Sequence, residues 1–131
     1  MPVELTLLGL TLLLAFVHIM AAARLRTRQF GTKWNVGARD EKMPPLNPLP
    51  ARMLRAQENL FETLPLFIAA VLGAAAANRL GTLTSIGAHL YFFGRLIYLP
   101  LYAAGVPVVR SLVWVAATGG LVLVIAGFML G

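Results

Sequence analysis

The 131-residue sequence contains no cysteine, and this absence excludes several kinds of chemistry. Without cysteine there is no disulfide framework, no thiolate metal site and no cysteine nucleophile. Any thiol that takes part in a reaction must therefore come from a substrate. The two histidines, His18 and His89, have no metal-like companion in the sequence. We expect each to be a satisfied or lumen-facing side chain, and we predict no metal site.

Charged residues are also scarce, at 12% of the chain, and only five are acidic. Hydrophobic residues make up 59%, and the mean hydropathy of +0.79 lies outside the range of an ordinary soluble domain. We therefore expect one membrane domain over residues 1–131, with no separate soluble catalytic domain. The net charge of +6 would suggest nucleic acid as a partner of a soluble protein. In a membrane protein the basic residues are topology signals, so we expect no nucleic-acid partner.

Four apolar segments are each about 20 residues or longer, which is the length needed to cross a bilayer. No basic residue precedes the first, so we expect a retained span and not a cleaved signal peptide. The predicted spans are residues 5–23, 51–78, 83–104 and 108–130. Because lipid requires every backbone polar group to be paired internally, these spans predict an all-α membrane protein, a four-helix transmembrane bundle.

The connections between the spans differ in length. Residues 24–50 form the one long loop, which we expect on the cytoplasmic side, because the run PPLNPLP cannot continue a helix. Pro50 suits the first turn of the second helix, where an amide is unpaired in any case. The stretches RLGT and GVP are short breaks, so successive spans should be antiparallel neighbours.

Basic residues gather on one side of the predicted membrane. The opposite side has only Arg79. By the positive-inside rule, both termini should face away from the cytoplasm, and Glu4 near the N-terminus should be interfacial. The residues on the basic side are Arg24, Arg26, Arg28, Lys33, Arg39, Lys42, Arg52, Arg55 and Arg110.

Two of the predicted spans carry a polar face. At about 100° per residue, four polar side chains of the second span fall in one sector, and Gln57 lies well off it. Spacings of four, three and four place polar residues of the third span on one face as well. The second-span residues are Arg52, Arg55, Asn59 and Glu62, and the third-span residues are Tyr91, Arg95, Tyr98 and Tyr102.

These faces have two explanations. In the first, the charges pair with each other and hold helices together, and the tyrosines form an interfacial belt. In the second, the faces line a pocket for an anionic peptide, with arginines for carboxylates, Asn59 and Gln57 for amides and Glu62 for an amino group. Arg110 also has two explanations, because it is either an arginine that sets the membrane topology or part of a binding site. Pro65 should bend the second helix beside this face.

The segment RAQENLFE, Arg55 to Glu62, followed by Pro65 and Phe67, resembles the second-helix motif of the MAPEG family, the membrane-associated proteins of eicosanoid and glutathione metabolism. The resemblance covers most of the chain. RLRTRQF is similar to the basic end of that family's first helix, GRLIYLPLY to its third helix and VVRS to the start of its fourth. Within the family, the chain most resembles a bacterial-type microsomal glutathione transferase.

The resemblance implies a homotrimer that binds glutathione as co-substrate between neighbouring protomers near the cytoplasmic face of a bacterial inner membrane. It implies that Arg110 activates the glutathione thiol, with Ser111 beside it. Gln57 would reach the ligand only across a subunit boundary. The residues implied to contact glutathione are Arg55, Asn59, Glu62, Tyr98 and Tyr102, with Gln57, Arg95 and Arg24 as further candidates.

The implied activity is glutathione transfer to a lipophilic electrophile, or reduction of a hydroperoxide, with the second substrate entering from the membrane lipid. Thr63 stands where some relatives have tyrosine, so the resemblance leaves the substrate open. Two alternatives are a non-catalytic protein that binds a lipid or a partner, and a small transporter with Glu62 as its proton carrier.

Overall fold

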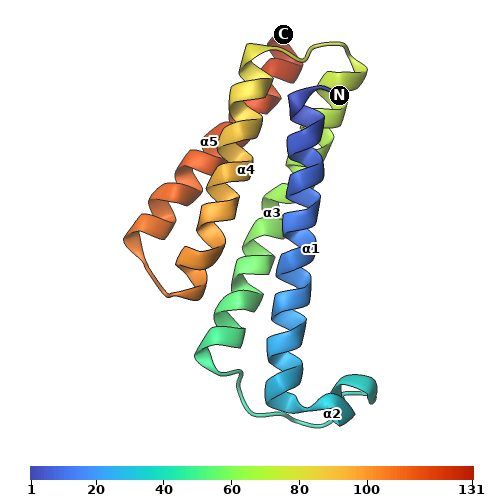
Figure 1. Ribbon diagram of the computed structural model, residues 1–131, viewed down its shortest axis with the longest axis vertical. Coiled ribbons are helices and arrows are strands. Elements are labelled where there is room, and N and C mark those ends of the chain that lie inside the picture. Colours follow the sequence, from blue (N-terminus) through green and yellow to red (C-terminus); the bar gives the residue numbers. More distant parts are fainter.

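The computed structural model describes all residues 1–131, and its secondary structure consists of helices with no strands. Four long helices and one short one follow in the order α1 (Val3–Phe30), α2 (Thr32–Val36), α3 (Pro48–Ala76), α4 (Thr82–Ala103) and α5 (Val108–Leu130). The long helices lie roughly along one axis, and both termini lie at the end that holds the α3–α4 turn (Figure 1). The α1–α3 connection and the α4–α5 turn lie towards the opposite end.

The long helices lie close to the segments predicted as spans, with two differences in their bounds. The first helix continues past the predicted end at Ala23 and stops at Phe30, where Gly31 takes a φ of 96° and donates its amide to the Thr27 carbonyl. No residue between these two points breaks a helix. The second long helix starts at Pro48, two residues before Pro50, because Pro48 itself occupies the first turn. The long loop also contains α2, which the sequence did not predict.

Three helices are long and apolar enough to cross a membrane, namely α1, α3 and α5. The fourth long helix, α4, has 22 residues and a length of about 33 Å. Its length suffices for a span, but Arg95, His89 and three tyrosines reduce its apolar character. The chain is therefore an integral membrane protein with at least three apolar spans, and the predicted fourth span depends on α4.

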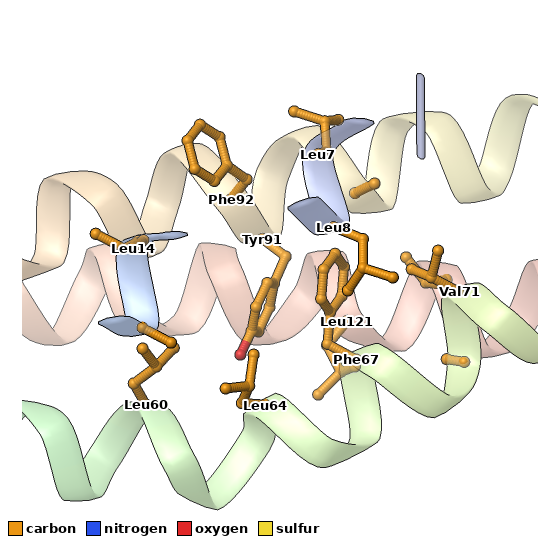
Figure 2. Packing of buried hydrophobic residues seen from close by; sticks show 14 residues of the cluster. Leu7, Leu8, Leu14, Leu60, Leu64, Phe67, Val71, Tyr91, Phe92 and Leu121 are labelled. Carbon is orange, nitrogen blue, oxygen red and sulfur yellow. The ribbon is translucent and has the colours of Figure 1, made fainter. Parts of the chain in front are cut away.

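The buried core lies where α3 meets the other three long helices. Leu60, Leu64, Phe67 and Val71 form the inward stripe of α3 (Figure 2). They pack against side chains of α1, α4 and α5, including Leu7, Leu14, Tyr91, Leu121 and Val124. Inside a bilayer such helix contacts are stabilised by close packing and hydrogen bonds, because lipid is as apolar as the core.

The sequence had suggested that Tyr91 belongs to a polar face, but Tyr91 is part of this core. Its side chain is 1% exposed, and its ring stacks on Phe67 with centroids 4.2 Å apart. Its hydroxyl lies 2.8 Å from the Thr63 hydroxyl of α3. One aromatic side chain thus supplies both packing and a hydrogen bond between α3 and α4.

We expect Tyr91→Phe to destabilise the protein by about 1 kcal/mol, because the ring contacts remain and only the hydrogen bond is lost. Thr63→Val should cost a similar amount, and the double variant should cost less than the sum. Unfolding in mixed detergent micelles measures all three. Strictly additive effects would show that the two hydroxyls do not stabilise each other.

The α4–α5 hairpin packs through small residues. A Cβ built on Gly87 would lie 2.5 Å from the Gly120 carbonyl oxygen, and one on Gly120 would lie 2.6 Å from that of Gly87. A Cβ on Gly94 would lie 2.8 Å from the Ala117 Cβ. The two backbones can approach this closely only because side chains are missing along the seam. This glycine seam makes α4 and α5 a single packed unit.

The end that holds the termini is closed by side chains that join helices. Glu4 is 4% exposed and accepts a 2.6 Å hydrogen bond from Thr84 in the first turn of α4. The sequence alone could not identify this hydrogen-bond partner, because it lies 80 residues away along the chain. Arg79 donates to the Phe128 and Met129 carbonyls at the end of α5. In the α3–α4 turn, Asn78 takes a φ of 57°, which ends α3.

The two histidines lie apart, each on its own helix. His18 is fully buried, and its Nδ1 donates to the Leu14 carbonyl at 2.9 Å, but its Nε2 has no partner. The expectation of a satisfied His18 therefore holds for one ring nitrogen only. Nδ1 of His89 donates to the Ser85 carbonyl at 2.7 Å.

Candidate functional site

Two hollows lie between α3 and the α4–α5 hairpin, and they share Arg110. The arginine hollow has a volume of about 230 Å³ and is lined by Arg52, Arg55, Tyr102, Gly105, Val106, Pro107 and Arg110. The tryptophan hollow has a volume of about 380 Å³ and is lined by Asn59, Tyr98, Arg110, Ser111, Trp114 and Val115. Their lining residues include ones in and beside the α4–α5 turn, which lies towards the same end of the molecule as the α1–α3 connection (Figure 1).

Three guanidinium groups line the arginine hollow, and two of them contact Tyr102. Nε of Arg55 donates to the Tyr102 hydroxyl at 3.3 Å, and the Arg110 guanidinium lies 4.6 Å from the centre of the Tyr102 ring. Nε of Arg52 donates to the Ala103 carbonyl at 2.9 Å. No acidic residue lines the hollow. Three like charges without a counter-charge repel one another, so this arrangement favours a ligand with more than one anionic group.

The GVP break gives the arginine hollow its shape. α4 ends at Ala103, and Gly105 takes a φ of 74°, a left-handed conformation that suits glycine. A Cβ built on Gly105 would lie 3.6 Å from Nη1 of Arg52. The turn lets α5 start next to the end of α4, so that Arg110, in the first turn of α5, lies over Tyr102.

Arg95 lies behind the tryptophan hollow and not in it. The side chain is 1% exposed, and its Nη1 donates to Oδ1 of Asn59 at 2.9 Å. Its guanidinium lies 4.3 Å from the centre of the Tyr98 ring. Glu62 attracts it electrostatically, yet Nε and Nη2 have no partner. Arg95 therefore positions two residues of the hollow, Asn59 and Tyr98, and does not line it.

Arg110, Ser111 and Trp114 face the tryptophan hollow from one side of α5. Their spacing of one and three residues puts them within about one helical turn. The Ser111 hydroxyl donates to the Pro107 carbonyl at 3.2 Å, which leaves its oxygen free to accept. A reacting atom between Arg110 and Ser111 would thus lie beside a fixed positive charge and a hydroxyl.

The structure separates the predicted site residues into three groups. Arg55, Asn59, Tyr98, Tyr102, Arg110 and Ser111 line the two hollows. Arg95 supports them from behind. Gln57, Glu62 and Arg24 line neither hollow within one chain. Glu62 is exposed on α3, whereas Arg24 lines a separate hollow of about 600 Å³ at the junction of α1 and α2.

Six lining residues are absent from the predicted glutathione-contacting and catalytic residues, namely Arg52, Gly105, Val106, Pro107, Trp114 and Val115. Helical spacing had already placed Arg52 on the polar face with Arg55, three residues further along α3. Trp114 lies four residues after Arg110, but its apolar ring has no feature that distinguishes it from lipid-facing neighbours. No group of three or more His, Asp or Glu side chains could hold a metal ion.

Comparison with known proteins gives one match. The family model of the MAPEG family matches residues 7–130, which include every predicted site residue. No curated protein and no solved structure matches the chain significantly.

Proposed function

Because this chain belongs to the MAPEG family, we propose that it is a glutathione-dependent membrane enzyme, a transferase or peroxidase acting on lipophilic electrophiles or hydroperoxides. The observation that carries the proposal is the position of Arg110, which is shared by a hollow with three guanidinium groups and a hollow with Ser111 and Trp114. Glutathione has two carboxylates and one thiol. Its carboxylates match the arginine hollow, and its thiol can then reach the boundary between the two.

Arg110 would act as the thiolate stabiliser. A free thiol has a pKa of about 8.5 and is mostly protonated at neutral pH, whereas a nearby guanidinium favours the anion. Arginine has no acceptor and does not lose its own proton, so the thiol proton goes to water. The thiolate then forms a bond to an electrophilic carbon, whose electron pair moves to the leaving or accepting atom. With a hydroperoxide, the thiolate attacks the distal oxygen, an S–O bond forms as the O–O bond breaks, and the alkoxide leaves and is protonated to an alcohol. The resulting glutathione sulfenic acid reacts with a second glutathione to give the disulfide and water.

The proposed assembly is a homotrimer with glutathione between protomers. The separation of Arg24, Gln57 and Glu62 from the two hollows supports it, because a neighbouring chain could bring such residues to the ligand. In this assembly α4 is the fourth span, and the termini face away from the cytoplasm of a bacterial inner membrane. The basic residues near the two hollows would then lie on the cytoplasmic side.

A titration of the purified protein with glutathione, monitored by thiolate absorbance, tests the activity. We expect a saturable thiolate signal at neutral pH, and no signal with S-methylglutathione, which has no thiol. The MAPEG family also contains members that are not enzymes. Binding of glutathione without a thiolate signal or turnover would therefore identify a non-catalytic binding protein and contradict the enzymatic proposal.

A further inference from the structure

Trp114 lines the tryptophan hollow, next to the position proposed for the glutathione thiol. It lies one turn along α5 from Arg110, a distance of about 6 Å along the helix axis. With Val115 it supplies the apolar part of the lining of the tryptophan hollow, which Asn59, Tyr98, Arg110 and Ser111 also line. A thiolate held at Arg110 would therefore share this hollow with the indole.

Resting on the proposed glutathione-dependent activity, we propose that Trp114 determines specificity by stacking on a flat aromatic ring of the electrophilic substrate. The Arg110 guanidinium packs on Tyr102, so it does not cover the indole. Trp114 is partly buried and is not a member of the buried core cluster. Its ring is thus available to a ligand in the hollow, and offset stacking of two rings adds to simple burial.

The size and the openings of the hollow agree with this class of substrate. Its volume of about 380 Å³ is near the lower end of small-molecule sites, so it suits one ring system and not a long, folded chain. On the same helix, Val115 is 60% exposed and Leu112 is 65% exposed. Both face outwards, so an apolar electrophile dissolved in lipid can approach the hollow along α5.

A matched pair of electrophiles separates ring recognition from reactivity. Benzyl and hexyl isothiocyanate have the same reacting group, in which the thiolate sulfur bonds to the central carbon. The electron pair of the C=N bond moves to nitrogen, which takes a proton from water. The two compounds differ in the group beside the reacting atoms, which is a flat ring in one and a flexible chain in the other.

The test measures kcat/KM for both compounds with the wild type, Trp114→Leu and Trp114→Phe. We expect the benzyl-to-hexyl ratio to fall by about tenfold in Trp114→Leu and to be largely retained in Trp114→Phe, with the KM for glutathione unchanged. Equal losses with both compounds, or an unchanged ratio, would overturn the proposal. Such a result would indicate that Trp114 is an interfacial anchor.

A binding measurement gives a second readout that does not need turnover. In a Trp34→Phe background, Trp114 is the only tryptophan, because the chain has two. S-benzylglutathione should quench its fluorescence more strongly than S-hexylglutathione. If the wild type shows no turnover, the proposed enzyme function fails, but preferential quenching still supports the ring contact. Equal quenching by the two conjugates contradicts the contact even when turnover is observed.

Discussion

Replacing Arg110 with alanine is expected to lower kcat/KM for glutathione-dependent turnover by about 10²-fold, as seen when one stabiliser of a developing anion is removed. Arg110 is the only side chain that lines both hollows, and it lies over Tyr102 at 4.6 Å. Without it, the thiol keeps a pKa near that in water, about 8.5. The thiolate absorbance of bound glutathione should therefore appear only at higher pH, which a pH titration of the complex measures.

Two further variants make the Arg110 experiment specific. Arg110→Lys retains a positive charge but loses the planar set of donors, so it should give activity between those of the wild type and Arg110→Ala. Lys33→Ala removes an exposed cation of α2 that lines neither hollow, and it should leave the thiolate titration unchanged. A wild-type titration curve for Arg110→Ala would rule out the assigned role.

Replacing Gly120 with alanine is expected to destabilise the protein by about 3 kcal/mol, at the upper end of the usual cost of overpacking. The new methyl group would lie 2.6 Å from the Gly87 carbonyl oxygen, 2.7 Å from the Leu90 Cβ and 2.8 Å from the Tyr91 amide nitrogen. All three atoms belong to the α4 backbone or are fixed to it, so no flexible side chain can move aside. Unfolding in mixed micelles should show the loss, and glutathione-dependent activity should fall because α4 also carries Tyr98 and Tyr102.

The neighbouring residue gives an unusually close control. Gly119 faces outwards, and a Cβ built on it meets no atom within 4 Å. Because alanine is the better helix former, Gly119→Ala should stabilise α5 by about 0.5 to 1 kcal/mol in the same assay. Adjacent substitutions of the same type should thus have opposite signs. Equal effects would mean that the glycine seam does not hold α4 against α5.

The sequence predicted the approximate ranges of the long helices because apolar runs fill their interiors and prolines or glycines lie near their ends. The end of α1 before Gly31 and the start of α3 at Pro48 were not predicted exactly. The polar face of α3 was also predictable from periodicity alone, since Arg55 and Asn59 share one side of a helix. That face does line the two hollows, except for Glu62.

The features that the sequence did not predict depend on which side of each helix packs against its neighbours. Arg95 and Tyr91 share one face of α4 with Tyr98, but both are buried at 1% exposure, and neither lines a hollow. A single helix cannot reveal how deeply its face is covered by another. For the same reason, the partner of Glu4 was not predicted and Trp114 was missed, because their surroundings come from segments far away in the sequence.

The glycine seam has a mechanical consequence for the two hollows. Tyr98, Tyr102, Arg110 and Trp114 belong to the α4–α5 hairpin, whereas Arg55 and Asn59 belong to α3, which is connected to the hairpin by the turn near Asn78 and packs against it through contacts such as the Phe67–Tyr91 stack. The turn that connects the two parts is far from the residues that line the hollows. A rotation of about 5° at that turn would move the far end of a helix of about 33 Å by roughly 3 Å. Such a pivot would widen the two hollows between α3 and the hairpin while the contacts inside the hairpin stay the same.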